Sequence, residues 1–175
     1  MILNLLKRIT QAFEKENIPY MLSGSLALNS YSVPRMTLDI DIVIELRQEN
    51  LDVFLSLFQN NYYIDNKTVR YETERVGMFN VIDHETGFKI DFILRKETDY
   101  RKLEFNRRRR IEILDFEVWI VSPEDLILSK IEWIQKLSSD KQMNDIQNLL
   151  TMPDLDKNYL LTWAKALNLK TFNLF

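Results

Sequence analysis

Apolar residues recur at helical spacing near the start of the chain and through its last third, and they alternate with polar residues in between. At the start, Leu6, Ile9 and Phe13 fall on one face of an expected amphipathic helix. The helix at 123 has a strong start, because Ser122 can cap it and Pro123 suits its first position. The helices expected from the pattern cover about 1–16, 26–31, 48–61, 123–137, 140–151 and 156–168.

Alternating apolar and polar residues predict the strands. The expected strands cover 20–22 and 38–45, and two β-hairpins are expected within 77–95 and 109–121. The second hairpin should turn at Asp115–Phe116, whereas the pattern over 62–76 favours no element. Helices that interleave with strands in this way predict an α+β fold, a mixed β-sheet flanked by helices. We expect a core over 1–121 and a C-terminal helical subdomain over 122–175, packed on the core.

The composition limits the class of protein. A chain of 175 residues, of which 46% are apolar, can bury one sizeable core. The absence of cysteine excludes disulfides and thiolate metal sites. The charges within the first helix argue against a signal peptide, and no apolar run has the length of a membrane span. A cytoplasmic protein is therefore expected.

Charge is distributed unevenly along the chain. The net charge of −3 argues against a generally basic surface that would bind nucleic acid. Residues 95–110, however, contain eight Arg or Lys and three Asp or Glu, a local charge of +5. The arginine run 107–110 is either a solvated face or the place where the backbone of an RNA acceptor would bind.

Two aspartates lie in the most apolar expected strand. Side chains alternate along a strand, so Asp39 and Asp41 share one face, roughly 7 Å apart, and apolar residues fill the other. Taken alone, this pattern is more typical of an ordinary strand with its polar face in water. A D-x-D sequence also occurs in glycosyltransferases.

A third carboxylate and a preceding Gly–Ser pair change the interpretation. Asp91 lies in another expected strand, and if the two strands are neighbours, the three carboxylates converge on one face. Such like charges are costly unless a cation lies among them, and carboxylate oxygens without His or Cys favour magnesium. Gly24 allows close approach to a ligand, and Ser25 begins a helix whose free N–H groups attract anions. The sequence therefore predicts a metal–triphosphate site.

Lys130 falls within an apolar stripe of its expected helix, over an arc of roughly 160° on a helical wheel. The stripe consists of Leu126, Ile127, Ile131, Trp133, Ile134 and Leu137. A lysine in that position either extends its amine into water, the commoner outcome, or meets an anion. We favour the anion because a phosphate site is expected elsewhere in the chain.

The segments GSLAL, YSVPRMTLDIDIVI and IDFI resemble the pattern of the nucleotidyltransferase superfamily, in which hG[GS] precedes DhD and a third acidic strand residue. With SPEDLILSKIEW and QMNDIQNLL, the chain is similar to AbiEii-type nucleotidyltransferases of bacterial toxin–antitoxin and phage-defence systems, over roughly residues 20–168. The resemblance implies a nucleotidyltransferase-like sheet, a nucleotide contact by Lys130 and a place for Asp145 in the same site. It also implies a tRNA 3′ end as acceptor and a cognate antitoxin as partner, which the residues themselves do not show.

These features predict a magnesium-dependent nucleotidyltransferase that moves an NMP group from a nucleoside triphosphate to a hydroxyl acceptor. The expected metal ligands and catalytic residues are Asp39, Asp41 and Asp91, with Asp91 also as general base, and the expected nucleotide- and phosphate-binding residues are Gly24, Ser25, Arg35, Lys130 and Asp145.

Several alternatives remain open at this stage. Arg35 is equally able to form a loop salt bridge, and Asp145 to be a surface or capping carboxylate. The acceptor can instead be a small molecule such as an aminoglycoside, and an inactive nucleotide-binding module is a further alternative. A glycosyltransferase is disfavoured, because it leaves Gly24–Ser25, Asp91 and Lys130 unexplained.

Overall fold

A computed structural model describes residues 1–137 and 139–175. The helices are α1 (Ile2–Lys15), α2 (Gly24–Asn29), α3 (Gln48–Leu57), α4 (Asn66–Arg75), α5 (Asp99–Asn106), α6 (Pro123–Lys136), α7 (Asp140–Leu150) and α8 (Lys157–Ala166). The strands are β1 (Tyr20–Ser23), β2 (Asp39–Ile44), β3 (Tyr62–Tyr63), β4 (Met78–Asp83), β5 (Lys89–Leu94), β6 (Arg109–Ile113) and β7 (Phe116–Ile120). The predicted α+β class is confirmed.

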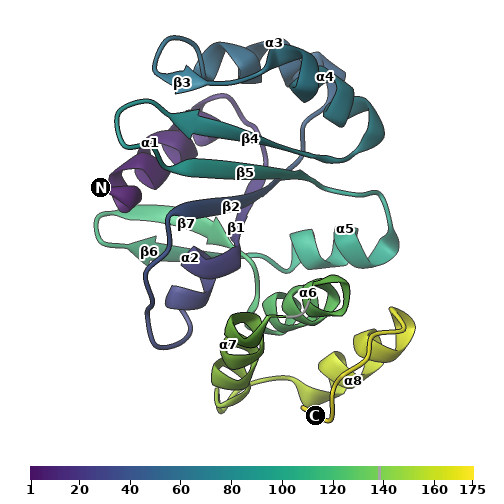
Figure 1. Cartoon of the computed structure of the whole chain (residues 1–175). Coiled ribbons are helices and arrows are strands. Elements are labelled where there is room, and N and C mark those ends of the chain that lie inside the picture. The colour runs from purple at the N-terminus through teal and green to yellow at the C-terminus, as the bar shows by residue number, and fades with distance from the viewer. Residues whose placement is uncertain (138) are drawn as a thin grey trace.

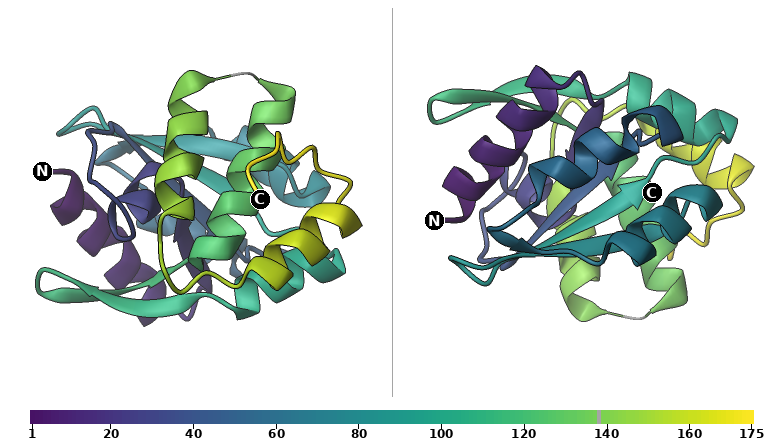
Figure 2. Two further views of the ribbon diagram at one scale, coloured as in Figure 1. Left: turned by 90° about the horizontal axis from the view of Figure 1, so that it is seen from below. Right: turned by 90° about the horizontal axis from the view of Figure 1, so that it is seen from above.

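Within the described residues the strands form one mixed seven-stranded sheet in the order β3-β4-β5-β2-β1-β7-β6 (Figure 1). Strand β2 lies in the middle, antiparallel to β1 and parallel to β5. Helices α6, α7 and α8 gather below the sheet in Figure 1, and α6 and α7 lie side by side (Figure 2). Because β2 is central, its backbone is paired with a strand on each side, and this pairing fixes the directions of its side chains.

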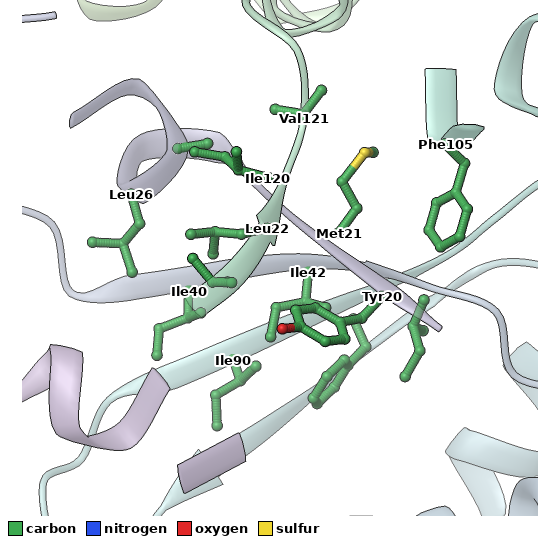
Figure 3. Close-up of a cluster of buried hydrophobic side chains, with 14 of the residues drawn as sticks. Tyr20, Met21, Leu22, Leu26, Ile40, Ile42, Ile90, Phe105, Ile120 and Val121 are labelled. Atoms are coloured by element: carbon green, nitrogen blue, oxygen red, sulfur yellow. The ribbon is translucent and has the colours of Figure 1, made fainter. Parts of the chain in front are cut away.

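One face of the sheet is apolar and covered. Phe92 of β5 meets Phe13 of α1 and Phe54 of α3, with ring centroids 5.9 and 5.2 Å from its own. Figure 3 shows Leu22, Ile42 and the neighbouring aliphatic side chains of the sheet packed together. This packing places the alternate residues of β2 and β5, the predicted acidic positions, on the opposite face.

The main differences from the predicted elements concern charged segments. Residues 62–76, which favoured no element, form β3 and α4. Helix α5 was not predicted; Thr98 caps it, and only Tyr100 and Phe105 bury large apolar side chains in it, too few for a clear apolar periodicity. The second hairpin turns one residue earlier than expected, at Leu114, where φ is +57°.

The apolar stripe predicted around Lys130 is narrower than expected. Trp133 and Leu137 are exposed, whereas Ile127 and Ile131 are fully buried. Trp133 lies at the edge of the arc, and Leu137 lies beyond the last helical residue of α6, where helical spacing no longer applies. Lys130 remains on the buried side of the helix.

No helix in the described ranges is long and apolar enough to cross a membrane.

Candidate active site

The three predicted carboxylates lie on two neighbouring strands. Strands β2 and β5 are parallel, and their register pairs Asp41 with Asp91 and Asp39 with Lys89. Residues paired in register point to the same face of a sheet, so Asp39, Asp41 and Asp91 share one face. Asp91 is largely buried, whereas the Asp39 side chain is 52% exposed. The carboxylate face therefore has a buried inner part and an open outer part.

Gly24 brings the chain into close contact with Asp41. Ser23, the last residue of β1, pairs with Asp41 in register, and the next residue, Gly24, has a φ of +62°. A Cβ atom at Gly24 would lie 1.8 Å from Oδ2 of Asp41. Glycine is required at this position for two reasons: the backbone is left-handed, and there is no room for a side chain. The backbone of the Gly–Ser pair thus packs directly against the Asp41 carboxylate.

The Asp41 carboxylate is in an unfavourable electrostatic environment. Burial raises its pKa, and the charges of Asp91 and Asp39 raise it further. Lys130 and the backbone N–H of Ser25 act in the opposite direction without cancelling the effect. A buried carboxylate with two like charges beside it favours the approach of a cation.

A residue that was not predicted for the site lies among these carboxylates. Nζ of Lys89 is 2.8 Å from Oδ2 of Asp91 and 3.7 Å from Oδ1 of Asp39. Alternation along β5 places Lys89 on the same face as Asp91. The missing step was its register opposite Asp39, which depends on the pairing of two strands far apart in the sequence.

Four of the five predicted nucleotide- and phosphate-binding residues form a second cluster. Nε and Nη2 of Arg35 donate to the two oxygens of Asp145, at 2.9 and 2.8 Å. Nη2 of Arg35 also donates to Oγ of Ser25 at 2.7 Å, and Nζ of Lys130 donates to Oδ2 of Asp145 at 2.9 Å. The structure therefore brings Ser25, Arg35, Lys130 and Asp145 together, although they come from α2, a loop, α6 and α7.

The pair Lys130–Asp145 is buried, with side chains 5% and 4% exposed. Burial lowers the pKa of Lys130, although the hydrogen bond to Asp145 favours its charged form. Burial acts to raise the pKa of Asp145, but hydrogen bonds from Arg35 and Lys130 hold it below its ordinary value. The anion that Lys130 meets here is thus a carboxylate of its own chain.

Gln142 was missed by the sequence prediction. Its Oε1 accepts a hydrogen bond from Nζ of Lys130 at 2.7 Å. It lies one turn before Asp145 on α7, so the spacing could have indicated it once Asp145 was assigned to the site.

The donor atoms of the carboxylate face are of the kind that a divalent metal prefers, but the side chains are not yet gathered around one point. These donors are carboxylate oxygens, the ligands that magnesium prefers, and burial, followed by the charges of Asp91 and Asp39, raises the pKa of Asp41. In the described part of the chain, no three His, Cys, Asp or Glu side chains are gathered closely enough to form a ready metal group. The residues fit magnesium if the Lys89 amine moves aside.

Two members of the arginine run, Arg107 and Arg108, are held within the molecule, whereas the side chains of Arg109 and Arg110 are 53% and 43% exposed. Arg107 donates to the buried Asp125 at 3.0 Å and to Glu124 at 3.1 Å. Arg108 lies over the rings of Phe105 and Trp119, and Arg110 pairs with Glu117. The hypothesis of a solvated basic face is wrong for Arg107 and Arg108.

The structure resembles solved nucleotidyltransferases at low sequence identity. One is the lincosamide antibiotic adenylyltransferase LnuA with lincomycin bound, at a TM-score of 0.60 and 18% identity over 83% of this chain and 94% of that chain. Another is ANT(2″)-Ia in complex with adenylyl-2″-tobramycin, at a TM-score of 0.60 and 15% identity over 94% of this chain and 95% of that chain.

A third similar structure is an antigenic nucleotidyltransferase-like protein from Paracoccidioides brasiliensis, at a TM-score of 0.54 and 19% identity over 94% of this chain and 85% of that chain. No protein-family model and no relative among the curated proteins matches the sequence. At these identities, the similarity shows that this chain has a nucleotidyltransferase-like fold.

Proposed function

We propose that the protein is a magnesium-dependent nucleotidyltransferase that transfers an NMP group from a nucleoside triphosphate to a hydroxyl acceptor. The observation that carries the proposal is the position of Asp41. It rests against Gly24, lies in register with Asp91, and interacts with Lys130 of the second cluster. A nucleotidyltransferase needs this combination of a carboxylate face for metal and an adjacent set of cations for phosphate.

In the reaction, the acceptor oxygen forms a bond to the α-phosphorus, the bond from that phosphorus to the bridging oxygen breaks, and pyrophosphate leaves. Asp39, Asp41 and Asp91 would hold the metal, and Asp91 would also take the proton of the acceptor hydroxyl as general base. Bound magnesium supplies positive charge that stabilises the triphosphate and the leaving group.

The second cluster binds the triphosphate. The Ser25 hydroxyl accepts a hydrogen bond from Arg35 and keeps its own proton to donate to a phosphate oxygen. Lys130 and Arg35 carry two positive charges against the one negative charge of Asp145. The surplus charge lies beside the carboxylate face, where negative charge develops on the phosphates.

Two classes of acceptor have separate support. A small hydroxyl compound, as in the antibiotic adenylyltransferases of similar fold, is favoured because Arg107 and Arg108 of the arginine run are held within the molecule. The 3′ end of a tRNA, with a cognate antitoxin as protein partner, is favoured by the Lys130–Asp145 pair, which joins the two segments that resemble AbiEii-type proteins. We place either reaction in the cytoplasm, where nucleoside triphosphates are available.

The test is a transfer assay with magnesium and each α-labelled nucleoside triphosphate in turn. One series contains total tRNA, and the other contains a panel of aminoglycosides and lincosamides. Label should pass to one class of acceptor, and that class identifies the substrate. The double variant Asp39→Ala/Asp41→Ala should lose transfer by at least about a thousandfold, since two of the three proposed metal-holding groups are gone.

A matched control is Asp52→Ala/Asp154→Ala, which removes two exposed carboxylates away from the site. It should transfer label like the unmodified protein. If no acceptor is labelled and no magnesium-dependent binding of triphosphate is measured, the proposal is wrong.

A further inference from the structure

The Lys89 amine lies where two of the proposed metal ligands face each other. Its Nζ is 2.8 Å from Asp91 and 3.7 Å from Asp39, and these distances correspond to an ion pair and a weaker charge contact. The lysine and Asp39 are opposite each other in the β2–β5 register, so the backbone itself directs the amine to this place. The sheet register thus fixes where the Lys89 side chain starts, and the flexible stem of the side chain decides where the amine lies.

The positive charge of the Lys89 amine reduces the repulsion between the carboxylates, as the charge of a metal ion would. Asp39, Asp41 and Asp91 bring three negative charges to one face, and a positive group between two of them reduces their repulsion. Lysine is suited to a temporary position, because its charge is compact and its stem has several rotatable bonds. The Lys89 side chain is 41% exposed, so it has open space into which the amine can swing.

We propose that Lys89 is a tethered cation that holds the carboxylate face together without metal and is displaced when a divalent ion binds. This inference rests on the proposed function of Asp39, Asp41 and Asp91. Each bound metal must first break the Lys89 contacts, so Lys89 weakens metal affinity while it stabilises the metal-free protein. The lysine would therefore raise the concentration of free magnesium at which the carboxylate face binds metal.

The test measures binding of Mn²⁺, as a magnesium substitute, to the whole protein without nucleotide, by calorimetry or by the electron paramagnetic resonance of free Mn²⁺. In Lys89→Gln, the dissociation constant should fall about two- to fivefold, the range expected for a partly exposed lysine–carboxylate pair. Without metal, the same variant should melt about 1–3 °C lower, and Mn²⁺ should raise its melting temperature by a larger amount.

Two further variants sharpen the result. Lys89→Arg keeps the charge and should bind Mn²⁺ about as the unmodified protein does. Lys102→Gln removes one positive charge and one surface pair, with Glu97 at 3.2 Å, away from the carboxylate face, and should leave Mn²⁺ affinity unchanged. A merely structural role for Lys89 would lower stability without tightening Mn²⁺ binding.

The outcomes separate this inference from the proposed function. If Lys89→Gln binds Mn²⁺ equally well or more weakly, while Asp39→Ala/Asp41→Ala abolishes binding, then Lys89 is not a tethered cation but the carboxylates still hold metal. If the unmodified protein binds no Mn²⁺, the metal-dependent function and the inference fail together.

Discussion

At the scale of single residues, two glycines with similar backbone conformations differ in the space available for a side chain. Gly24 and Gly87 both have positive φ, +62° and +70°. An added Cβ at Gly24 would collide with Asp41, whereas at Gly87 it would meet nothing within 4 Å. The two positions therefore share the backbone cost of a side chain but differ in what the side chain would displace.

We predict that Gly24→Ala and Gly87→Ala both lower the free energy of unfolding by about 1–2 kcal/mol, the cost of a left-handed non-glycine residue. Of the two variants, Gly24→Ala should lose more of the free energy of unfolding, because its new side chain also forces the Asp41 carboxylate to move. Only Gly24→Ala should also lose Mn²⁺ binding and nucleotidyl transfer. Urea unfolding and Mn²⁺ titration of both variants check this, and equal Mn²⁺ affinity in the two would contradict the role given to Gly24.

The residues that could be predicted are those whose environment depends on local spacing. Strand alternation places Asp39 and Asp41 on one face, and helical spacing places Lys130 among apolar neighbours. The contact between Arg35 and Asp145 could not be derived that way. These two residues are 110 positions apart, and their contact depends on how α7 packs against the loop before β2.

At the scale of elements, Asp145 joins three parts of the chain. It accepts hydrogen bonds from Arg35 of the loop before β2 and from Lys130 of α6, while it lies on α7 itself. Removing a charge from a buried pair leaves the partner charges uncompensated, and this usually costs more than the pair had contributed. The position of α7 should therefore depend strongly on this one carboxylate.

We predict that Asp145→Asn lowers the free energy of unfolding by about 3 kcal/mol at neutral pH. Because hydrogen bonds from Arg35 and Lys130 outweigh burial and hold the folded-state pKa of Asp145 below 3.8, its charge stabilises the protein above about pH 4. That stability is lost as pH falls through the lowered pKa. The difference between the unmodified protein and the variant should then shrink, as urea unfolding between pH 7 and pH 3 would measure.

The control for this prediction is Asp154→Asn, which changes an exposed carboxylate by the same substitution. It should have little effect at any of these pH values. A constant difference between Asp145→Asn and the unmodified protein across the range would show that the charge of Asp145 is not what stabilises the junction.

Elements with clear periodicity could be predicted, and those made of charged residues could not. The three C-terminal helices lie within two residues of their expected bounds. Helix α5 was missed because its charged side chains are stabilised by distant partners, such as the Arg101 pair with Glu132 of α6. The basic segment 95–110 follows the same rule. Its local positive charge is balanced only in the folded chain, where carboxylates from distant positions, such as Glu132, lie beside it.

At the scale of the whole molecule, one apolar cluster extends from the sheet into the C-terminal helices. It includes Ile40 and Ile90 of the sheet together with Ile127, Ile146 and Leu160 of α6, α7 and α8. Polar contacts cross the same boundary, because Arg107 and Tyr100 both contact the fully buried Asp125 of α6. We therefore propose that residues 122–175 form a helical subdomain, and that the core over 1–121 needs this subdomain in order to fold stably.

We predict that residues 1–121 alone do not unfold cooperatively. Without α6, the apolar face that meets Ile127 and Ile131 becomes exposed, and Arg107 loses both of its carboxylate partners. Urea unfolding of this fragment, followed by near-ultraviolet circular dichroism, should show no sharp transition. Mixing it with residues 122–175 should restore one, since the lost contacts form again between the fragments. A cooperative transition in 1–121 alone would instead mean that the core folds independently of the C-terminal helices, which supply Lys130 and Asp145 to the second cluster.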